Sequence, residues 1–269
     1  MSLSYFYIDP RPESKHNETM IVREVQAKSI LNKSKIHDYC VNPYTGCQVG
    51  CRYCYAALFI PRYSGHAEPW GTFVDAKVNA PEVLRRQLRR AKPGTVWVSS
   101  VCDPYQPAEE RFGLTRACLE ALRESRFPVR VQTKSARLLR DLDLMRTMDG
   151  LTVTITIATD DERMARLFEP GASPIVERLA ALARLHDAGI RTGAFVGPIL
   201  PGNPERLVSL LAGKVDEALI DRLNYVPALR AFYERHGLAE AATEAFFQSR
   251  RRAYAEAFRR VGVPFTIVF

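Results

Sequence analysis

Three closely spaced cysteines are the residues of this sequence best suited to chemistry. Cys47, Cys51 and Cys54 follow the spacing C-x3-C-x2-C. Thiolates are soft ligands that suit iron–sulfur clusters, and clustered thiols in a reducing compartment more often bind metal than form disulfides. Gly46 and Gly50 each precede a cysteine and give the backbone the freedom for a tight turn. Three ligands leave one iron of a 4Fe–4S cluster open, and an open position is typical of catalytic metal sites.

Two other interpretations of these cysteines remain open. A zinc site could combine them with Cys40 or His66. Alternatively, an iron–sulfur cluster with a fourth protein ligand could transfer electrons without catalysing a reaction. Another cysteine, Cys118, lies on the apolar face of a predicted helix and is expected in the core.

Alternating strands and helices are expected to position the cysteines. Apolar and β-branched runs predict strands near 39–45 and at 95–100, 128–133, 151–159, 190–199 and 217–225. Helical spacing predicts helices at 114–125, 136–148, 173–189, 204–213 and 239–260. Such alternation gives βαβ units on a parallel sheet, whose ligands gather at the carboxyl ends of the strands. About six units indicate an α/β fold with an open, partial barrel or a doubly wound sheet, since a closed barrel needs eight.

The chain divides into a core and two flanking segments. Residues 1–36 are predicted to form a polar N-terminal arm, 37–230 the core, and 231–269 a C-terminal helix and tail that pack on it. Residues 56–80 lack clear periodicity and are predicted to form a long loop. Loops of this length are usually functional, so this one could act as a lid.

The charge of the chain favours, without proving, a polyanionic partner. Its formal net charge is +8. Basic residues gather in two clusters, which are Arg85, Arg86, Arg89, Arg90 and Lys92, and Arg250, Arg251 and Arg252. Such clusters can bind nucleic acid. The alternative, that they are solvated helix faces, holds for most charge runs.

Composition and the N-terminus favour a cytoplasmic protein. Hydrophobic residues make up 46% of the chain and charged residues 25%, as in globular proteins. No apolar run is long enough to span a bilayer, and the first residues lack the apolar region of a signal peptide. We therefore expect no membrane partner.

The cysteine motif and four later segments resemble a known family. NPYTGCQVGCRYCYA, with Tyr53 before the third cysteine, resembles the signature of the radical S-adenosylmethionine (SAM) superfamily and, within it, the spore photoproduct lyase-like branch of DNA repair photolyases. Similar to the same branch are VCDPYQPAEERFGLTRACLEAL, VQTKSARLLRDL, FEPGASPIVERLAAL and VGPILPGNPE. The resemblance implies a partial (β/α)6 TIM-like barrel of the radical SAM type.

The resemblance also implies an activity. In this family the open iron binds SAM and the reduced cluster breaks its S–C5′ bond, giving a 5′-deoxyadenosyl radical that abstracts hydrogen from the substrate. The branch implies a lyase-like repair reaction on DNA or another nucleic acid, with an electron donor such as flavodoxin or ferredoxin. Two alternatives stay open: radical modification of a peptide or small molecule, and a non-catalytic iron–sulfur protein.

Family positions suggest the residues that contact SAM. Ser99 and Ser100 end the second strand, where the family usually holds the SAM amino group. Lys134 follows the third strand, where the branch pairs a lysine with the SAM carboxylate. Thr156, near the end of the fourth strand, could bind ribose or simply favour the strand. Tyr53 is expected to stack near adenine or to pack the loop.

Cys102 and Tyr105 are the candidate catalytic residues. Both lie just past the second strand, on either side of Asp103-Pro104. In spore photoproduct lyase a cysteine of this region donates a hydrogen atom to the product radical, although its register differs from that of Cys102 by a few residues. Cys102 could instead be a small packed residue. Tyr105 and Asp103 are expected to orient substrate or to cap the next helix.

Overall fold

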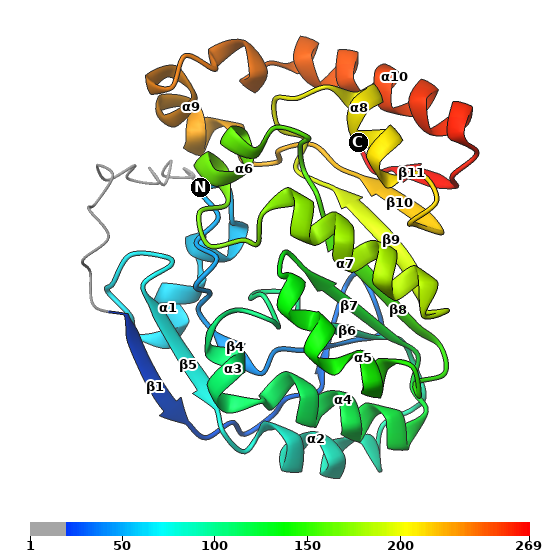
Figure 1. The fold of residues 1–269 in the computed structure, drawn as a ribbon. Coiled ribbons are helices and arrows are strands. Elements are labelled where there is room, and N and C mark those ends of the chain that lie inside the picture. Colours follow the sequence, from blue (N-terminus) through cyan, green and yellow to red (C-terminus); the bar gives the residue numbers. More distant parts are fainter. Residues whose placement is uncertain (1–19) are drawn as a thin grey trace.

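A large, mainly parallel sheet forms the centre of the molecule (Figure 1). The computed structural model describes residues 20–269. The eight strands of this sheet run in the order β11-β10-β9-β8-β7-β6-β3-β2. Their bounds in chain order are Asn32–Lys33 (β2), Tyr39–Val41 (β3), Val96–Val98 (β6), Val129–Thr133 (β7), Leu151–Thr156 (β8), Arg191–Val196 (β9), Glu217–Ile220 (β10) and Phe265–Ile267 (β11).

The sheet is open. Within this sheet, β3, β6, β7, β8, β9, β10 and β11 are parallel to one another. The short β2 is antiparallel to β3, and the edge strands β2 and β11 each have one neighbour. Six parallel strands from β3 to β10 alternate with helical segments along the chain. The predicted α/β fold with a partial, unclosed (β/α)6 barrel is therefore confirmed.

Helices connect the strands of the large sheet along the chain. They are α2 (Ala80–Leu88), α3 (Ala108–Phe112), α4 (Leu114–Ser125), α5 (Leu142–Met145), α6 (Glu162–Phe168), α7 (Ile175–Asp187) and α8 (Pro204–Leu211). The predicted helix at 136–148 is a 3-10 segment, η2 (Ala136–Asp141), followed by the short α5. Sequence periodicity accounts for α4, in which Leu114, Cys118 and Leu122 recur every four residues and are buried.

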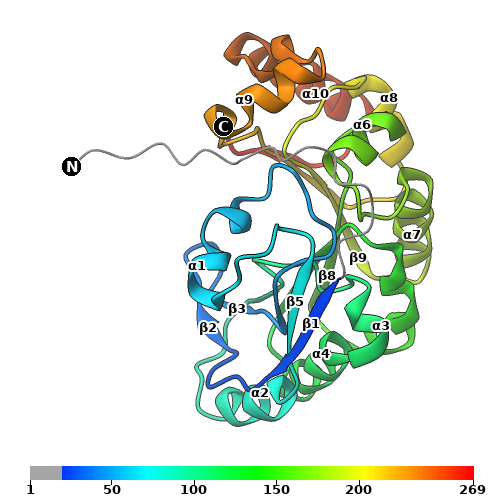
Figure 2. The same cartoon turned by 90° about the vertical axis from the view of Figure 1, so that its left-hand side faces the viewer.

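A second, three-stranded sheet carries the cysteine segment. Its order is β1 (Ile21–Val25), β5 (Phe73–Lys77) and β4 (Tyr44–Thr45), with β1 parallel and β4 antiparallel to β5. Figure 2 shows this sheet and α1 (Ile60–Ser64) on the side of the large sheet opposite α7 and α8. The cysteines follow β4 directly.

The prediction for residues 56–80 needs correction here. Residues 56–80 are not one loop, because they contain most of the 3-10 segment η1 (Tyr55–Leu58), then α1, β5 and the first residue of α2. Residues 20–36 of the expected polar arm supply β1 and β2, whereas residues 1–19 lie outside the described part. Strand β5 shows no period-two pattern because both of its faces are buried.

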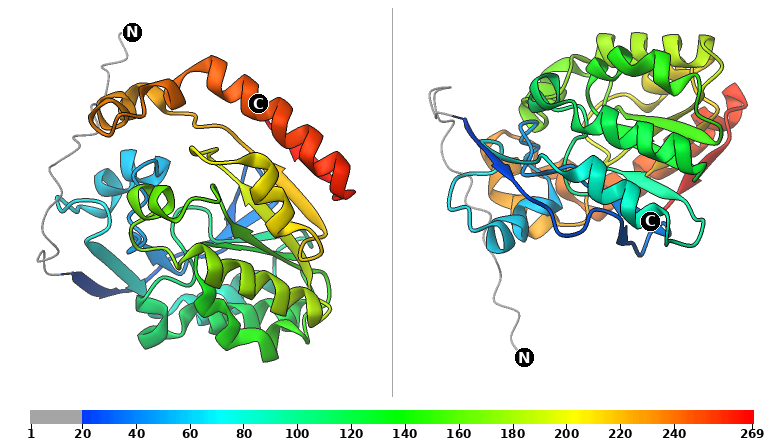
Figure 3. Two further views of the ribbon diagram at one scale, coloured as in Figure 1. Left: turned by 45° about the horizontal axis from the view of Figure 1, so that its top comes forward. Right: turned by 90° about the horizontal axis from the view of Figure 1, so that it is seen from below.

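The C-terminal segment closes over one end of the sheet. After α9 (Val226–Arg235) and η3 (Ala239–Ala242), α10 (Glu244–Val261) runs beside α8 (Figure 3). The side chain of Thr243 accepts a hydrogen bond from the N–H of Phe246 and starts α10 at that point, so the helix is shorter than predicted. The apolar tail pairs with β10 as β11. Within residues 20–269, no helix is both long and apolar enough to cross a bilayer.

Candidate functional site

The cysteine segment begins with a turn that only glycine fits. Gly46 has a φ of 84°, and a Cβ there would lie 2.3 Å from the carbonyl oxygen of Phe73 in β5. Two backbone hydrogen bonds between residues three apart then fold the segment. The N–H of Gly50 donates to the carbonyl of Cys47, and the N–H of Cys54 donates to the carbonyl of Cys51. The three cysteines therefore lie on successive tight turns.

A second segment, residues 168–173, supports these turns from the other side. The N–H of Arg52 donates to the carbonyl of Phe168 at 2.9 Å, and the N–H of Gly171 donates to Val49 at 3.0 Å. A Cβ on Gly171 would lie 2.4 Å from the carbonyl oxygen of Gln48. The two backbones thus approach so closely that residue 171 has no room for a side chain.

Two glutamines join the cysteine segment to the segment after β6. The N–H of Gln48 donates to the side chain of Gln106 at 2.9 Å, and the side chain of Gln106 donates to the carbonyl of Gly46 at 3.4 Å. In return the side chain of Gln48 accepts from the N–H of Ala108 at 2.6 Å. Gln106 is fully buried, so these bonds form without competition from water.

The three cysteines share one small apolar cluster. Cys47 and Cys51 are buried and Cys54 is half-buried; Tyr53, Trp70, Cys102 and Ala172 complete the packing around them. No disulfide joins any cysteine of residues 20–269. Burial raises the pKa of all three thiols, that of Cys51 to about 12. The protein alone therefore disfavours thiolates here, and a bound metal group would supply the positive charge that stabilises them.

A cluster fits this site better than a single ion. Among residues 20–269, no three His, Cys, Asp or Glu side chains converge on one point as ligands of one metal ion. The thiolates of a 4Fe–4S cluster bind different irons and stand further apart. Trp70 Nε1 is buried beside the cysteines without a hydrogen-bond partner in the described chain, and a cluster sulfur could accept a hydrogen bond from it.

His66 is committed to other contacts. Its Nδ1 lies 2.8 Å from Glu68 and its Nε2 lies 3.1 Å from Asp75 of β5. The imidazole also stacks on Phe73, with ring centroids 4.0 Å apart. With both ring nitrogens occupied, His66 anchors the segment to the small sheet. This geometry argues against the zinc alternative that used His66.

A buried ion pair supports the ring of Tyr53. The Tyr53 hydroxyl donates to Glu169, and Arg178 of α7 donates to the other carboxylate oxygen of Glu169 at 2.7 Å. Arg178 also donates to the carbonyls of Ser173 and Thr156, at 2.8 and 2.9 Å. Glu169 and Arg178 are almost fully buried. Their pairing and additional bonds satisfy both charges.

Lys134 lies over this ring and beside the cysteines. Its Nζ is 5.7 Å from the centroid of the Tyr53 ring. Burial alone lowers the pKa of Lys134, but the Coulombic attraction of Cys51 in its thiolate form, Glu169 and Asp103 outweighs this effect, so the pKa is raised. The ammonium group is therefore held charged at the carboxyl end of β7, next to the cysteine cluster.

Ser99 and Ser100 are tied to the neighbouring strand through Asn42. The side-chain oxygen of Asn42 accepts from the N–H groups of Ser100 and Val101 at 2.8 and 3.0 Å. The Ser99 hydroxyl donates to the carbonyl of Val41 at 3.3 Å, and the carbonyl of Ser100 accepts from the hydroxyl of Tyr55. The two serines thus follow β6 at the same edge of the sheet as the cysteine segment.

Cys102 and Tyr105 separate in the structure. Cys102 packs against the cysteine cluster, its thiol donates to the carbonyl of Tyr44 at 3.6 Å, and burial raises its pKa to about 11. Tyr105 belongs to the main core instead, and its hydroxyl donates to Asp141 at 3.1 Å. The geometry brings Cys102 to the cysteines and argues against a catalytic role for Tyr105.

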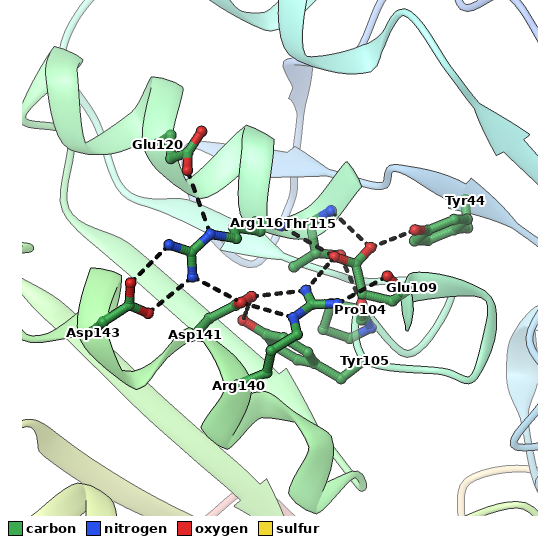
Figure 4. Close-up of polar contacts among 10 residues, drawn as sticks. All are labelled: Tyr44, Pro104, Tyr105, Glu109, Thr115, Arg116, Glu120, Arg140, Asp141 and Asp143. Carbon is green, nitrogen blue, oxygen red and sulfur yellow. Dashed lines mark hydrogen bonds and ion pairs between the residues drawn. The ribbon is translucent and has the colours of Figure 1, made fainter. Parts of the chain in front are cut away.

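The partners of Tyr105 form a buried polar network behind the site (Figure 4). Asp141 accepts from Arg116 and Arg140, and Arg140 also donates to Glu109 at 2.7 Å. Glu109 accepts in turn from the hydroxyl of Tyr44, two residues before Gly46. The network therefore fixes the strand from which the cysteine segment leaves.

Thr156 is close to the site but already bonded. It is fully buried in β8, where its Oγ1 lies 3.4 Å from the donating side chain of Gln132 and its carbonyl accepts from Arg178. Thr156 is connected to the site through Arg178, which donates both to the Thr156 carbonyl and to Glu169.

The basic clusters lie on outer helices. Arg86, Arg89 and Arg90 are exposed on and just after α2, at the bottom of Figure 1, and Arg251 and Arg252 are exposed on α10. Neither helix follows β4, which carries the cysteine segment. The two basic clusters therefore match the alternative of solvated helix faces more closely than that of a basic rim around the cysteines.

Several residues that shape the site could not be recognised from local sequence patterns. Glu169 and Arg178 lie in the segment FEPGASPIVER, whose apolar helix pattern gave no reason to place a charged pair in the core. Gln48, Gln106 and Trp70 also carry no local signal. The structure shows that Arg178 takes a position of α7 that the helix otherwise fills with buried apolar residues.

The family model "Radical SAM superfamily" matches residues 41–211 of this chain. An uncharacterized protein of Methanocaldococcus jannaschii is 33% identical over 187 residues, which are 69% of this chain and 70% of that protein. A protein of Pseudomonas phage M6, named radical SAM Nalpha-GlyT isomerase, is 25% identical over 71% of this chain, but the match spans only 38% of the phage protein.

A solved structure shares the fold. Spore photoproduct lyase complexed with dinucleoside spore photoproduct superposes with a TM-score of 0.66 and 16% identity, over 92% of this chain and 82% of that one. The matched region of the family model contains the three cysteines, the strands β6 to β9 and Lys134. This chain belongs to the radical SAM superfamily and is a radical SAM enzyme.

Proposed function

We propose that this enzyme cleaves SAM reductively and uses the resulting radical on a nucleic-acid component. The observation that carries the proposal is the packing of Cys47, Cys51 and Cys54 into one small cluster, with the charged Lys134 beside it. A 4Fe–4S cluster held by these thiolates would supply one electron to the sulfonium of SAM, whose S–C5′ bond would break to give methionine and a 5′-deoxyadenosyl radical.

Lys134 is proposed to hold the carboxylate of SAM. Its backbone N–H donates to Asp103 at 2.7 Å, which fixes the residue at the end of β7, while its ammonium group stays on the side of Cys51. A charged ammonium in a half-buried position favours a carboxylate strongly. Ser99 and Ser100, at the end of β6, are proposed to accept hydrogen bonds from the SAM amino group.

The adenosine half is proposed to lie against Tyr53 and Thr156. The ring of Tyr53 is held in place by Glu169, and Arg178 joins Glu169 to the carbonyl of Thr156. This chain of contacts fixes a flat surface for adenine relative to the end of β8. A rigid arrangement matters because a radical acts on the atom that lies nearest to it.

Cys102 is proposed to be the group that returns a hydrogen atom to a product radical. Its thiol packs against the cysteine cluster, which places it within the same site. The step breaks the S–H bond and leaves a thiyl radical, which needs a later reductant. An electron donor such as flavodoxin or ferredoxin is proposed for both reductions, that of the cluster before SAM cleavage and that of the thiyl radical afterwards.

A nucleic-acid substrate is supported by two observations. The chain carries a net charge of +8, and its fold resembles spore photoproduct lyase, a protein solved with a dinucleoside lesion. A lyase-like repair reaction in the cytoplasm fits both. A peptide or small-molecule substrate is the competing outcome of the test below.

Anaerobic reconstitution tests the proposal. The protein is loaded with iron and sulfide, reduced with dithionite and given SAM, and 5′-deoxyadenosine is measured alone and with damaged or undamaged DNA. We expect slow release without substrate and faster release with one of the nucleic acids. Release that only a peptide or small-molecule pool accelerates would move the substrate to another class, and no 5′-deoxyadenosine under any condition would contradict SAM cleavage.

A further inference from the structure

A row of aromatic rings extends outward from the cysteine segment. Tyr55, Phe59 and Tyr63 are spaced four residues apart along η1 and α1. The ring centroids of Tyr55 and Phe59 lie 5.9 Å apart, and those of Phe59 and Tyr63 lie 6.4 Å apart. Phe59 lies between the two helical segments, and its ring is tilted by 35° to that of Tyr55 and stands at 67° to that of Tyr63, so the three adjacent rings form a bent strip. The strip begins at the residue that follows Cys54.

The strip is exposed at both ends. Tyr63 is 84% exposed and Tyr55 is 39% exposed, whereas Phe59 is half-buried between them. Tyr225, just before α9, is 45% exposed. Exposed aromatic groups that adjoin one another mark a binding surface.

The start of the strip is held rigidly. The hydroxyl of Tyr55 donates to the carbonyl of Ser100, and the N–H of Ser100 is bonded to Asn42 at 2.8 Å. Phe59 packs against the small core of Ala56, Ile60 and Phe73. These contacts fix two of the rings before any ligand arrives, which lowers the entropy cost of binding.

We propose that Tyr55, Phe59 and Tyr63 form a platform on which unpaired bases of a single-stranded nucleic acid stack. The proposal rests on the nucleic-acid substrate proposed above and deepens it. Flat rings offer successive bases a stacking face without reading their sequence, and the net charge of +8 suits the phosphate backbone. The exposed Arg52, within the cysteine segment, is the nearest cation in sequence to the start of the strip.

This platform explains how a base would reach the site. Chemistry on a base inside a duplex requires that the base leave the stack. A strip that begins beside Cys54 would hold the neighbouring bases of an unpaired segment while one base enters the site. We therefore expect single strands to bind more tightly than duplexes of the same length.

Fluorescence anisotropy with a labelled oligothymidine of about twelve nucleotides tests the platform at low salt. Three substitutions at the most exposed ring separate stacking from apolar contact. Tyr63→Phe keeps a flat ring, Tyr63→Leu keeps apolar area without a ring, and Tyr63→Ala removes both. Stacking on one aromatic ring predicts that Tyr63→Ala and Tyr63→Leu weaken binding about 5- to 100-fold, while Tyr63→Phe changes it less than about twofold.

The measurement needs neither SAM nor turnover, so it separates the two proposals. Because Tyr63 is 84% exposed, all three variants should melt at the wild-type temperature, and melting curves check this. Unchanged binding in Tyr63→Ala, or wild-type binding in Tyr63→Leu, would overturn the platform and leave SAM cleavage untouched. If no nucleic acid binds and an apolar peptide does, the platform and the nucleic-acid substrate both fail, while release of 5′-deoxyadenosine remains a separate result.

Discussion

The backbone N–H of Asp103 lies 3.3 Å from the sulfur of Cys47 and points at it as a donor. The carboxylate of the same residue accepts from the hydroxyl of Thr133 at 2.6 Å and from the N–H of Lys134 at 2.7 Å. One aspartate therefore sets the distance between the first cysteine and the lysine proposed to bind SAM. Hydrogen bonds to cysteine sulfur also tune the potential of iron–sulfur clusters.

Replacing Asp103 by asparagine should destabilise the protein. Both carboxylate oxygens accept from N–H or O–H donors, so the amide NH2 of asparagine would face a donor and leave it unpaired. We expect a loss of about 1–3 kcal/mol in the free energy of unfolding, measured by urea denaturation. Asp149→Asn, at an exposed position, is the control and should change little. Equal effects of the two substitutions would contradict the role given to Asp103.

Replacing Glu169 by glutamine should be more costly. Arg178 would keep a hydrogen-bond partner but lose its counter-charge in a buried site. Breaking a buried ion pair on one side costs about 3–5 kcal/mol, and Tyr53 would lose its charged acceptor as well. Thermal melting checks the prediction. The exposed Glu177→Gln, beside Arg178 in α7, should melt as the wild type does, and a stable Glu169→Gln would show that the pair is dispensable.

Gly171→Ala should impair cluster loading. The added Cβ would stand 2.4 Å from the carbonyl of Gln48 and push the cysteine turns outward. We expect a lower iron content after reconstitution, measured per chain by a colorimetric iron assay. Gly65→Ala is the control for an added Cβ without a steric clash, because no atom lies within 4 Å of the new Cβ; its φ of 70°, unlike the backbone of Gly171, adds a strain of its own that should not affect iron loading. Full iron loading of Gly171→Ala would show that the turns tolerate displacement.

Lys134→Ala should weaken SAM binding. Loss of a charge-assisted hydrogen bond to the carboxylate predicts about 1.5–3 kcal/mol in binding free energy. Calorimetric titration of reconstituted protein measures the affinity directly. Lys134→Arg keeps the charge and should retain part of the affinity. An unchanged affinity in Lys134→Ala would remove Lys134 from the binding site while leaving the cysteines in place.

The sequence predicted the parts of the fold that depend on local patterns. Strand β7 alternates buried and half-buried residues, and α4 repeats apolar residues every four positions, so both were recognised within about a residue. Strand β5 was missed because it forms by pairing with β1, about fifty residues earlier in the chain, and has no exposed face. Local periodicity carries no information about such a partner.

The site divides in the same way. The cysteines and Lys134 could be placed because motif spacing and strand ends are local features. Glu169 and Gln106 could not, since each acts through contacts with the cysteine segment 58 to 116 residues away in the chain. The position of Tyr105 after a strand is also a local feature, but the direction of its side chain, into the core toward Asp141, is not.

Electron paramagnetic resonance of the reduced, reconstituted protein tests the central claim most directly, namely that three thiolates hold a four-iron cluster with one open iron. We predict the signal of a reduced 4Fe–4S cluster that changes when SAM is added, and its loss in Cys51→Ala. A cluster signal that SAM does not alter, or that survives in Cys51→Ala, would contradict the assignment.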